Sequence, residues 1–459
     1  MSNENTQRLV VVGGDAAGMS AASQAKRRNP DLDVVVLEQG DFISYAACGM
    51  PYMISGAVAE SDSLLVLKPE TARKRRGLDV RMRHRVLGID VKRKVVQFED
   101  LEQGRNDELP YGSCVVATGA VPIVPSVPGV NLDGVMTLRS FESGLVIRKA
   151  MADHVPKRSV VVGSGLVGLE MAEALTSLGS AVTILKRTGD AILGLYPELA
   201  EVVAEELARN GCTLLMKTAL EGLEGTDRVE MVLGGGEVIP ADFVLLAVGV
   251  QPASDLAREA GMTLGVKGAI AVDEHMETSA AGVFAAGDCV DQVHGVSGEK
   301  VFVPQALSAN RQGRVAGANA GFVVAGSSNR LTNPPVYSTF VTKVFGLEVA
   351  RTGLTMADAQ RVGLDAGIMA IKASSRAHYY PGSAPLHVAV LYEKGTGRLL
   401  GAQMVGSDGV AKRIDTFVTA LSAGMDLEAV SRLDLAYAPP FAPVWDPVLV
   451  AVNVAKKRV

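Results

Sequence analysis

Apolar residues form strand-type runs and helix-type patterns that alternate along the chain, and this order predicts an α/β fold. Short β-branched runs at 9–12 and 34–37 are typical of buried strands. A Gly-rich turn and an Ala-rich helical stretch separate these two runs. The same order of strand, turn, helix and strand returns over residues 159–189. The sequence therefore predicts the βαβ unit twice.

Two further segments predict that one unit is inserted into the other. Residues 113–122 and 243–252 each read as a buried strand that ends at a Gly and leaves through a Pro. From about residue 330, strands with turns and one helical segment predict a third, α+β domain. The predicted domains are 1–115 and 251–329 as two parts of the first, 116–250 as the insertion, and 330–459 as the third.

Composition narrows the class of protein. A length of 459 residues suits two or three domains, and the net charge of −5 argues against a general nucleic-acid binder. The start of the chain lacks a secretory signal, and no apolar run reaches membrane-spanning length. Cys48, Cys114, Cys212 and Cys289 form neither a disulfide framework nor a metal-ligand cluster. We therefore expect a soluble, cytoplasmic protein with reduced thiols.

The turn of the first unit has the features of a dinucleotide site. Its residues are Gly13, Gly14, Asp15, Ala16, Ala17 and Gly18. The following helix would offer free N–H groups and a positive dipole end to a pyrophosphate. Glu38, 20 residues beyond Gly18, ends the second strand, where its carboxylate can accept ribose hydroxyls. Asp15 replaces the middle Gly of the usual pattern and puts a side chain near the pyrophosphate. The alternative is a simple tight turn between a strand and a helix.

The turn of the second unit is complete, with Gly163, Gly165 and Gly168 at the three positions. Its second strand ends at Lys186, followed by Arg187, where the first unit has an acidic residue. A carboxylate there would repel the 2′-phosphate of NADPH, whereas two cations would attract it. The second site is therefore predicted to prefer NADPH over NADH. The alternative is a pair of solvated basic residues.

A third signature lies at 278–290, where a predicted strand runs into Gly287 and Asp288. In two-dinucleotide flavoproteins such an Asp meets the ribityl chain of the flavin, and the following helix points at the ring system. An Asp in an ordinary turn is the alternative. We assign further cofactor contacts to residues Ala117, Thr118, Gly119, Glu170, Gly249 and Ala306.

With these motifs the sequence resembles the pyridine nucleotide–disulfide oxidoreductases over essentially its whole length. The resemblance implies two Rossmann-like domains of the glutathione reductase type, which bind FAD and NAD(P), and a C-terminal dimerisation domain that makes a homodimer. Members of the glutathione reductase type use two cysteines five positions apart. Here SYAACGMPY, residues 44–52, contains Cys48 alone. The chain is therefore similar to the single-cysteine branch, which includes coenzyme A-disulfide reductases, NADH peroxidases and NADH oxidases.

Two features make coenzyme A-disulfide reductases the closest match. Ala16 stands where the peroxidases and oxidases usually carry an active-site His. The segments HYYPGSAPLH and AYAPPFAPVWDP resemble two tyrosine motifs of that subfamily, in which tyrosines of one subunit reach the partner's cysteine. Tyr379 and Tyr437 match these motifs best, and Tyr380 is a near alternative to Tyr379.

The resemblance implies that Cys48 takes its redox partner from a diffusible thiol. NADPH would reduce the flavin, and the flavin would reduce a Cys48–S–S–CoA mixed disulfide. A helix that begins near Met50 would lower the pKa of the thiol. Tyr437, assisted by Tyr379, would protonate the departing CoA thiolate, and Ser44 would hydrogen-bond near the thiol.

A densely basic stretch, residues 72–85, would suit the phosphates of CoA near the cysteine. Within and just before it, Lys68, Arg73 and Lys74 are the favoured contacts. A solvated basic face is an equal alternative.

Other functions remain open on the same sequence. A reductase of persulfides or polysulfides would need the same Cys48. An NAD(P)H oxidase would lack the usual His, because that position is Ala16. A flavoprotein electron carrier would need neither the cysteine nor the tyrosine motifs. Structural alternatives are a small core residue for Cys48 and core or interface aromatics for the tyrosines.

Overall fold

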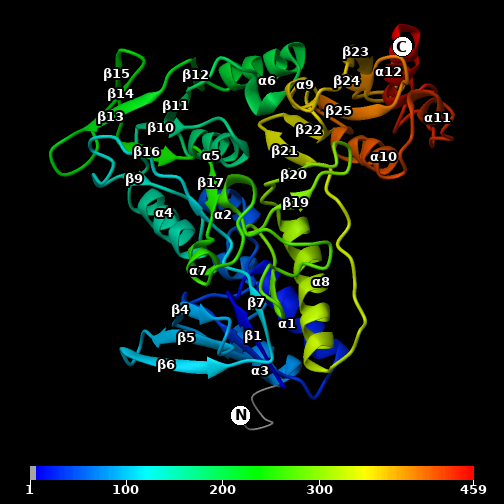
Figure 1. Ribbon diagram of the computed structural model, residues 1–459. Coiled ribbons are helices and arrows are strands. Elements are labelled where there is room, and N and C mark those ends of the chain that lie inside the picture. Colours follow the sequence, from blue (N-terminus) through cyan, green and yellow to red (C-terminus); the bar gives the residue numbers. More distant parts are fainter. Residues whose placement is uncertain (1–6) are drawn as a thin grey trace.

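The computed structural model describes residues 7–459, so residues 1–6 of the predicted first domain lie outside the described part of the chain. Its first sheet has five parallel strands in the order β18-β7-β1-β2-β3. Figure 1 shows this sheet at the N-terminal end of the molecule. The strands are β1 (Arg8–Val12), β2 (Asp33–Leu37), β3 (Asp79–Arg81), β7 (Ser113–Val116) and β18 (Val283–Ala285).

Two long helices pack against each other on this sheet. They are α1 (Ala16–Arg28) and α8 (Ala306–Val324). Glycines of α8 allow the close approach, because a Cβ at Gly313 would lie 2.2 Å from the carbonyl oxygen of Ala17, and one at Gly317 would lie 2.1 Å from that of Ala21. Beside them lie α3 (Pro69–Arg76) and a small antiparallel sheet of β4 (His84–Asp90), β5 (Val95–Asp100) and β6 (Arg105–Pro110).

A second parallel sheet repeats this plan, with the order β12-β11-β10-β16-β9. Its strands are β9 (Val135–Met136), β10 (Arg158–Val162), β11 (Ala181–Lys186), β12 (Thr213–Met216) and β16 (Phe243–Leu246). Its helices are α4 (Phe141–Asp153), α5 (Leu166–Ser177) and α6 (Pro197–Arg209). A three-stranded antiparallel sheet joins it, made of β13 (Leu220–Glu224), β14 (Met231–Gly234) and β15 (Glu237–Pro240).

The chain leaves the first unit and returns to it through a two-stranded antiparallel ribbon. The ribbon pairs β8 (Ala120–Pro122) with β17 (Val250–Pro252), and the chain then forms α7 (Asp255–Glu259) before β18 completes the first sheet. We propose domain boundaries near residues 115, 250 and 329 on this topology.

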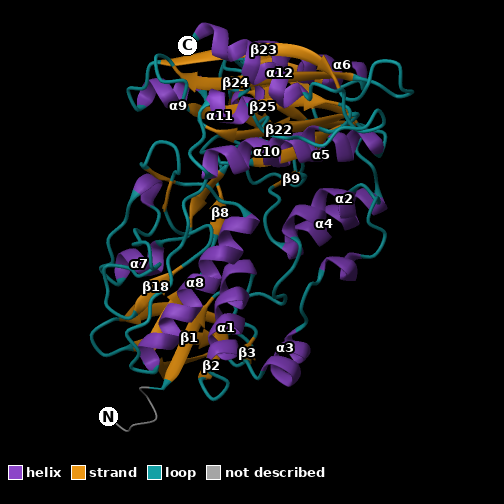
Figure 2. Cartoon of the chain, turned by 90° about the vertical axis from the view of Figure 1, so that its right-hand side faces the viewer, coloured by secondary structure: helices purple, strands orange, loops and turns teal. Residues whose placement is uncertain are grey.

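The C-terminal part is an antiparallel sheet covered by helices, at the opposite end from the first sheet (Figure 2). The strand order is β21-β22-β25-β24-β23, with bounds Phe340–Val344, Leu347–Gly353, Leu399–Gly406, Pro385–Glu393 and Ala366–Ser374. The helices are α9 (Met356–Arg361), α10 (Val410–Ser422), α11 (Leu427–Ser431) and α12 (Pro447–Ala455). One apolar core joins Phe417 of α10 and Val452 of α12 to Val388 of β24. The predicted fold class, two Rossmann-like units and a C-terminal α+β domain, is confirmed.

The Gly-rich turns of the two Rossmann-like units make the same close contact with the backbone of a neighbouring strand. A Cβ at Gly13 or at Gly163 would lie 2.3 Å from a carbonyl oxygen at the neighbouring strand end, that of Ala117 or of Ala247. Both glycines have positive φ, 102° and 113°. Each turn therefore requires Gly at its first position, because no side chain fits there.

No helix within residues 7–459 is both long enough and apolar enough to span a bilayer.

We predict that Gly168→Ala destabilises the protein by about 3 kcal/mol, because its Cβ would lie 2.1 Å from the carbonyl oxygen of Gly163. Gly165→Ala is the matched control, since no atom lies within 4 Å of a Cβ at that position. Thermal unfolding of the two variants should separate them. Equal unfolding temperatures would contradict the close helix–strand packing.

Candidate functional site

The first Gly-rich turn is held by the carboxylate of Glu38. The amide of Gly14 donates to its Oε2 at 2.6 Å, and the amide of Gly40 donates to its Oε1 at 2.7 Å. Burial raises the pKa of this carboxyl, although the amide hydrogen bonds oppose the rise. Each oxygen keeps a further lone pair, so Glu38 is able to accept ribose hydroxyls while it holds the turn.

Asp15 is the N-cap of α1, yet its side chain makes no capping hydrogen bond. Its Oδ1 is buried and has no hydrogen-bond partner among the described residues. Burial raises the pKa of this carboxyl to about 6, the backbone amides near it and Arg139 oppose the rise, and Glu38 adds to it. An unpartnered buried oxygen next to bare helix amides is suited to a polar ligand.

Asp288 lies at the end of β18 and is paired with an arginine from the second unit. The guanidinium of Arg139 donates to Asp288 Oδ2 at 2.8 Å and to the carbonyl oxygen of Ala120 at 3.0 Å. The neighbouring Gly287 amide donates to Gln312 of α8 at 2.9 Å. Nothing in the sequence around Arg139 indicated this role, because the pairing spans 149 positions of the chain.

The other predicted flavin contacts gather at the same end of the first sheet. Ala117, Thr118 and Gly119 directly follow β7, and Thr118 donates from its hydroxyl to the carbonyl oxygen of Ala253 at 2.6 Å. Ala306 is the first residue of α8 and is exposed. These residues fit a dinucleotide such as FAD: a turn closed by Glu38, free amides at α1, and an unsatisfied buried oxygen on Asp15.

Cys48 is the exposed cysteine of the four, and it lies just before the short helix α2 (Met50–Ile54). The helix packs against α4, where a Cβ at Gly144 would lie 2.9 Å from the sulfur of Met50; Figure 2 shows the two helices side by side. Ser44, in the preceding loop, has a positive φ of 46° and donates its amide to the carbonyl oxygen of Gly14 at 3.0 Å. This bond ties the cysteine loop to the Gly-rich turn.

The expected lowering of the Cys48 pKa is wrong for the chain itself. Although Cys48 is partly exposed, the protein around its sulfur displaces water, and this desolvation raises the pKa of the thiol. Repulsion from Glu170 and Asp288 adds to the rise, whereas Arg139 opposes it. Glu170 belongs to α5 and accepts a hydrogen bond from the hydroxyl of Thr342 at 3.0 Å.

The tyrosines of the two C-terminal motifs are brought together at one surface. The amide of Ala377 donates to the carbonyl oxygen of Pro439 at 3.3 Å, which joins the two loops. Tyr379 and Tyr437 are exposed, with relative accessibilities of 65% and 46%, and Tyr380 is exposed beside them. A hydrogen bond with the Tyr379 hydroxyl raises the pKa of Tyr437.

Large apolar side chains surround these tyrosines and are also exposed. They are Phe441, Val444 and Trp445, with relative accessibilities of 76%, 67% and 62%. Exposed apolar side chains of this kind are typical of surfaces that contact another protein, a membrane or a ligand.

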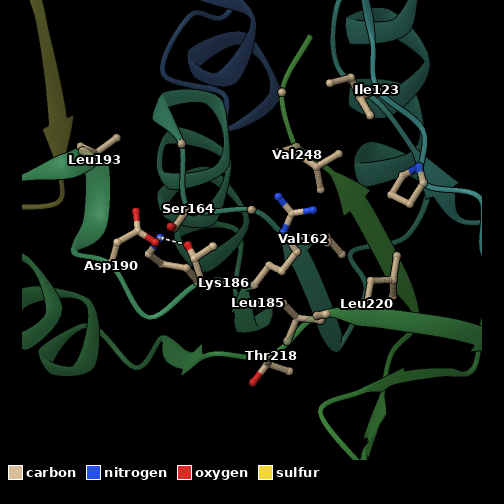
Figure 3. Close-up of a pocket in the computed structure, with 18 of the residues that line it drawn as sticks. Ile123, Val162, Ser164, Leu185, Lys186, Asp190, Leu193, Thr218, Leu220 and Val248 are labelled. Carbon is tan, nitrogen blue, oxygen red and sulfur yellow. Dashed lines mark hydrogen bonds and ion pairs between the residues drawn. The ribbon is translucent and has the colours of Figure 1, made fainter. Parts of the chain in front are cut away.

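A cavity of about 630 Å³ lies against the turn of the second unit (Figure 3). Among its lining residues are five of the predicted contacts: Gly163, Gly165, Lys186, Arg187 and Gly249. Gly168 packs beneath the turn, and Glu170 is not among the lining residues, so its predicted cofactor contact stays a prediction.

The two cations at the end of β11 differ in their surroundings. The ammonium of Lys186 is buried and donates to Thr188 at 2.9 Å and to Asp190 at 3.1 Å. Arg187 is exposed, and within residues 7–459 no hydrogen bond or ion pair involves its guanidinium. Arg187 therefore has its full donor set available to a ligand in this cavity.

The basic stretch at 72–85 is divided between internal contacts and a surface hollow. Lys68 pairs with Asp62 at 2.9 Å, Arg73 donates to the carbonyl oxygen of Val80, and Lys74 is exposed. A hollow of about 380 Å³ brings two cations of this stretch, Arg75 and Arg76, together with Lys26 and Arg27, which the sequence analysis did not name. Its lining residues are Ser23, Lys26, Arg27, Pro30, Arg75 and Arg76.

Comparison with known proteins identifies relatives along nearly the whole chain. A family model described as pyridine nucleotide-disulphide oxidoreductase matches residues 7–313, and the model of its dimerisation domain matches residues 339–447. The chain is 39% identical over 458 residues to the NAD(P)H coenzyme A polysulfide/persulfide reductase of Pyrococcus horikoshii, covering 99% of this chain and 100% of the relative. It is 34% identical over 452 residues to an NADH oxidase of Methanocaldococcus jannaschii, covering 98% and 99%.

Among solved structures, reduced Bacillus anthracis CoADR-RHD superposes with a TM-score of 0.94 and 33% identity. The match covers 98% of this chain and 80% of that chain.

We predict that Glu170→Gln makes alkylation of Cys48 by iodoacetamide about two- to fivefold faster between pH 7 and 8, because it removes a charge that disfavours the thiolate. Glu173→Gln, one turn further along α5, is the control, since Glu173 bonds instead to the amide of Phe345. The alkylation rate is measured against pH on the flavin-free chain. If Glu170→Gln does not change the alkylation rate at any of these pH values, the carboxylate of Glu170 does not lie close enough to Cys48 to affect its thiol.

Proposed function

The chain belongs to the pyridine nucleotide-disulphide oxidoreductase family, and from this membership we propose that it is an NAD(P)H- and FAD-dependent reductase of coenzyme A disulfide. The observation that carries the proposal is the isolation of Cys48. Cys114, Cys212 and Cys289 are buried, whereas Cys48 is exposed beside Asp288 and Glu170. A disulfide on Cys48 therefore takes its second sulfur from outside the chain.

The reaction balances with Cys48 as the nucleophile. The Cys48 thiolate attacks one sulfur of CoA–S–S–CoA, which forms a Cys48–S–S–CoA bond and releases one CoA thiolate. When bound, FAD supplies the two electrons of NAD(P)H. These electrons break the mixed disulfide and return Cys48 to a thiolate with release of a second CoA thiolate. Two protons convert the two CoA thiolates to thiols. One derives from the hydride of NAD(P)H after its electrons have been passed on, and the other comes from solution.

The chain's own residues set the protonation state of the sulfur. The thiol of Cys48 has a raised pKa, so the deprotonated form depends on nearby positive charge. The guanidinium of Arg139 is the cation that lowers it, and its ion pair with Asp288 fixes its place. Arg139 therefore places a positive charge that favours the Cys48 thiolate, whereas the negative charge of Glu170 disfavours the thiolate.

The tyrosines support a site shared between two subunits. Tyr379 and Tyr437 lie on an exposed aromatic surface of the C-terminal domain, and we propose that this surface meets a second copy of the chain. Their hydroxyls would then protonate the departing CoA thiolate of the partner subunit's site. Ser44 would hydrogen-bond near the thiol from the cysteine loop.

The basic hollow supports recognition of CoA phosphates. Arg27 and Lys26 extend from the last turn of α1, and Arg75 and Arg76 extend from the last turn of α3. The first turn of α1 belongs to the flavin site, and Arg27 lies about 16 Å further along the helix. The extended pantetheine arm of CoA would run along this helix and bring its sulfur to Cys48, while Lys68, Arg73 and Lys74 remain weaker candidates.

A second candidate is the reduction of persulfides or polysulfides with Cys48 as the attacking thiolate. The name of the Pyrococcus horikoshii relative supports it, and the same exposed cysteine serves both reactions. An NAD(P)H oxidase is a weaker candidate, because Ala16 stands where the oxidases usually carry an active-site His. We also propose a cytoplasmic location, where the thiols stay reduced.

We predict that Cys48→Ser lowers turnover with CoA disulfide about 10³-fold or more, because a serine hydroxyl does not form the mixed disulfide. Cys212→Ser is the control, since Thr176 lies 3.2 Å from that sulfur and would bond to a hydroxyl. Mass spectrometry of the untreated protein should find an adduct of CoA mass on Cys48. An added mass of sulfur atoms alone would favour the persulfide reaction, and full activity of Cys48→Ser would overturn both.

We also predict that Arg187→Ala raises the KM for NADPH about tenfold or more and leaves the KM for NADH nearly unchanged, because the exposed guanidinium reads the 2′-phosphate. Lys186→Met should affect both cofactors, since this ammonium holds Thr188 and Asp190 in the cavity wall. Steady-state kinetics with each cofactor gives the ratio. Equal changes for Arg187→Ala would refute the assignment.

A further inference from the structure

The turn that receives the flavin pyrophosphate carries an acidic side chain where its sister turn has Gly. Asp15 and Gly165 hold the same position in the two units, and each is the N-cap of its helix. Above Gly165 the space is open, since nothing lies within 4 Å of a Cβ. An ionised carboxylate at this position would lie against the two negative charges of a pyrophosphate, so the first turn has an electrostatic problem that the second lacks.

The side chain of Asp15 does not turn away to solvent or cap its helix. Its Oδ1 is buried and unpartnered among residues 7–459, and the side chain does not cap α1, although the backbone amides of Tyr45 and Ala16 favour its ionised form. Leaving a buried carboxylate oxygen unpaired costs free energy, whereas a carboxylic acid that donates to a ligand oxygen recovers a hydrogen bond.

The charged groups around Asp15 are mostly carboxylates. From the end of β2, Glu38 faces it; from the loop before α4, Arg139 faces it, with Asp288 of the β18 end bonded to that guanidinium. Tyr45 of the cysteine loop lies nearby, and burial raises the pKa of its phenol, with Asp15, Glu142 and Glu38 adding to the rise. One arginine therefore faces several carboxylates before any phosphate is added.

Resting on the proposed FAD site, we propose that Asp15 binds the flavin pyrophosphate as a neutral carboxylic acid, donating its O–H to a phosphate oxygen, so that loading of FAD takes up one proton.

The pKa of Asp15 in the flavin-free chain determines how FAD affinity changes with pH. Burial already raises the pKa of Asp15 to about 6, and two added negative charges raise it further. Below about pH 6 the carboxyl is protonated before and after binding, so affinity does not change with pH. Above that pH each flavin bound requires a proton from solution, and the dissociation constant of FAD rises about tenfold per pH unit until the pKa of the loaded state is reached.

The test measures flavin affinity and does not use enzyme activity. Holoenzyme is diluted at pH values between 5 and 8.5, and the fluorescence of released FAD gives its dissociation constant at each pH. The wild-type chain should lose affinity steadily above pH 6, by about 30-fold or more at pH 8. Asp15→Asn keeps a donor without a titrating proton, so its dissociation constant should stay flat over this range and be the lower of the two at pH 8.

Two further variants keep the result interpretable. Asp15→Gly restores the residue of the sister turn and should also give a flat profile, which covers the case in which Asp15→Asn folds poorly. Glu142→Gln removes a neighbouring carboxylate and should keep the wild-type slope. A wild-type profile without slope, or the same slope in Asp15→Asn, overturns the proposal while leaving the flavin site intact. A chain that binds no FAD at any pH refutes the proposed function instead.

Discussion

The close contact between backbone and backbone at the two Gly-rich turns is the constraint on which the other features depend. At each turn the chain passes within van der Waals contact of a carbonyl oxygen at the end of the neighbouring strand, which only Gly allows. The contact brings each helix N-terminus to the carboxyl end of its sheet and leaves its first amides free for a phosphate. Ser44 bonds to Gly14, so the same turn also fixes the loop that carries Cys48.

Around Cys48 the structure supplies more negative than positive charge. Glu170 and Arg139 come from the second unit, and Asp288 comes from the resumed first unit. The reactivity of the thiol is therefore a property of how the two units meet. Because a raised pKa keeps most of the sulfur protonated near neutral pH, one cation and a bound cofactor have a large influence on it.

The same balance of charge occurs at the flavin turn. Asp15 and Glu38 lie at one turn, and each has a raised pKa because burial removes water from the carboxyl. Glu38 receives two backbone amides, whereas the Oδ1 atom of Asp15 receives none. The two carboxyls of this turn thus differ in their partners: the chain itself satisfies Glu38, whereas Asp15 keeps an unpartnered oxygen that is available to a ligand.

The local pattern of the sequence determined the two βαβ units, their glycines, the acidic end of β2 and the solitary Cys48, because strands, turns and helix starts depend on residues close in the chain. It led to the wrong direction for the Cys48 pKa, since that value depends first on desolvation by the folded chain and then on Glu170 and Asp288, 122 and 240 positions away. It also missed Arg139, and it missed that Lys26 and Arg27 join Arg75 and Arg76 of the basic stretch at one hollow. Only the tertiary structure decided these, because charge acts through space and the folding of the chain sets which charges become neighbours.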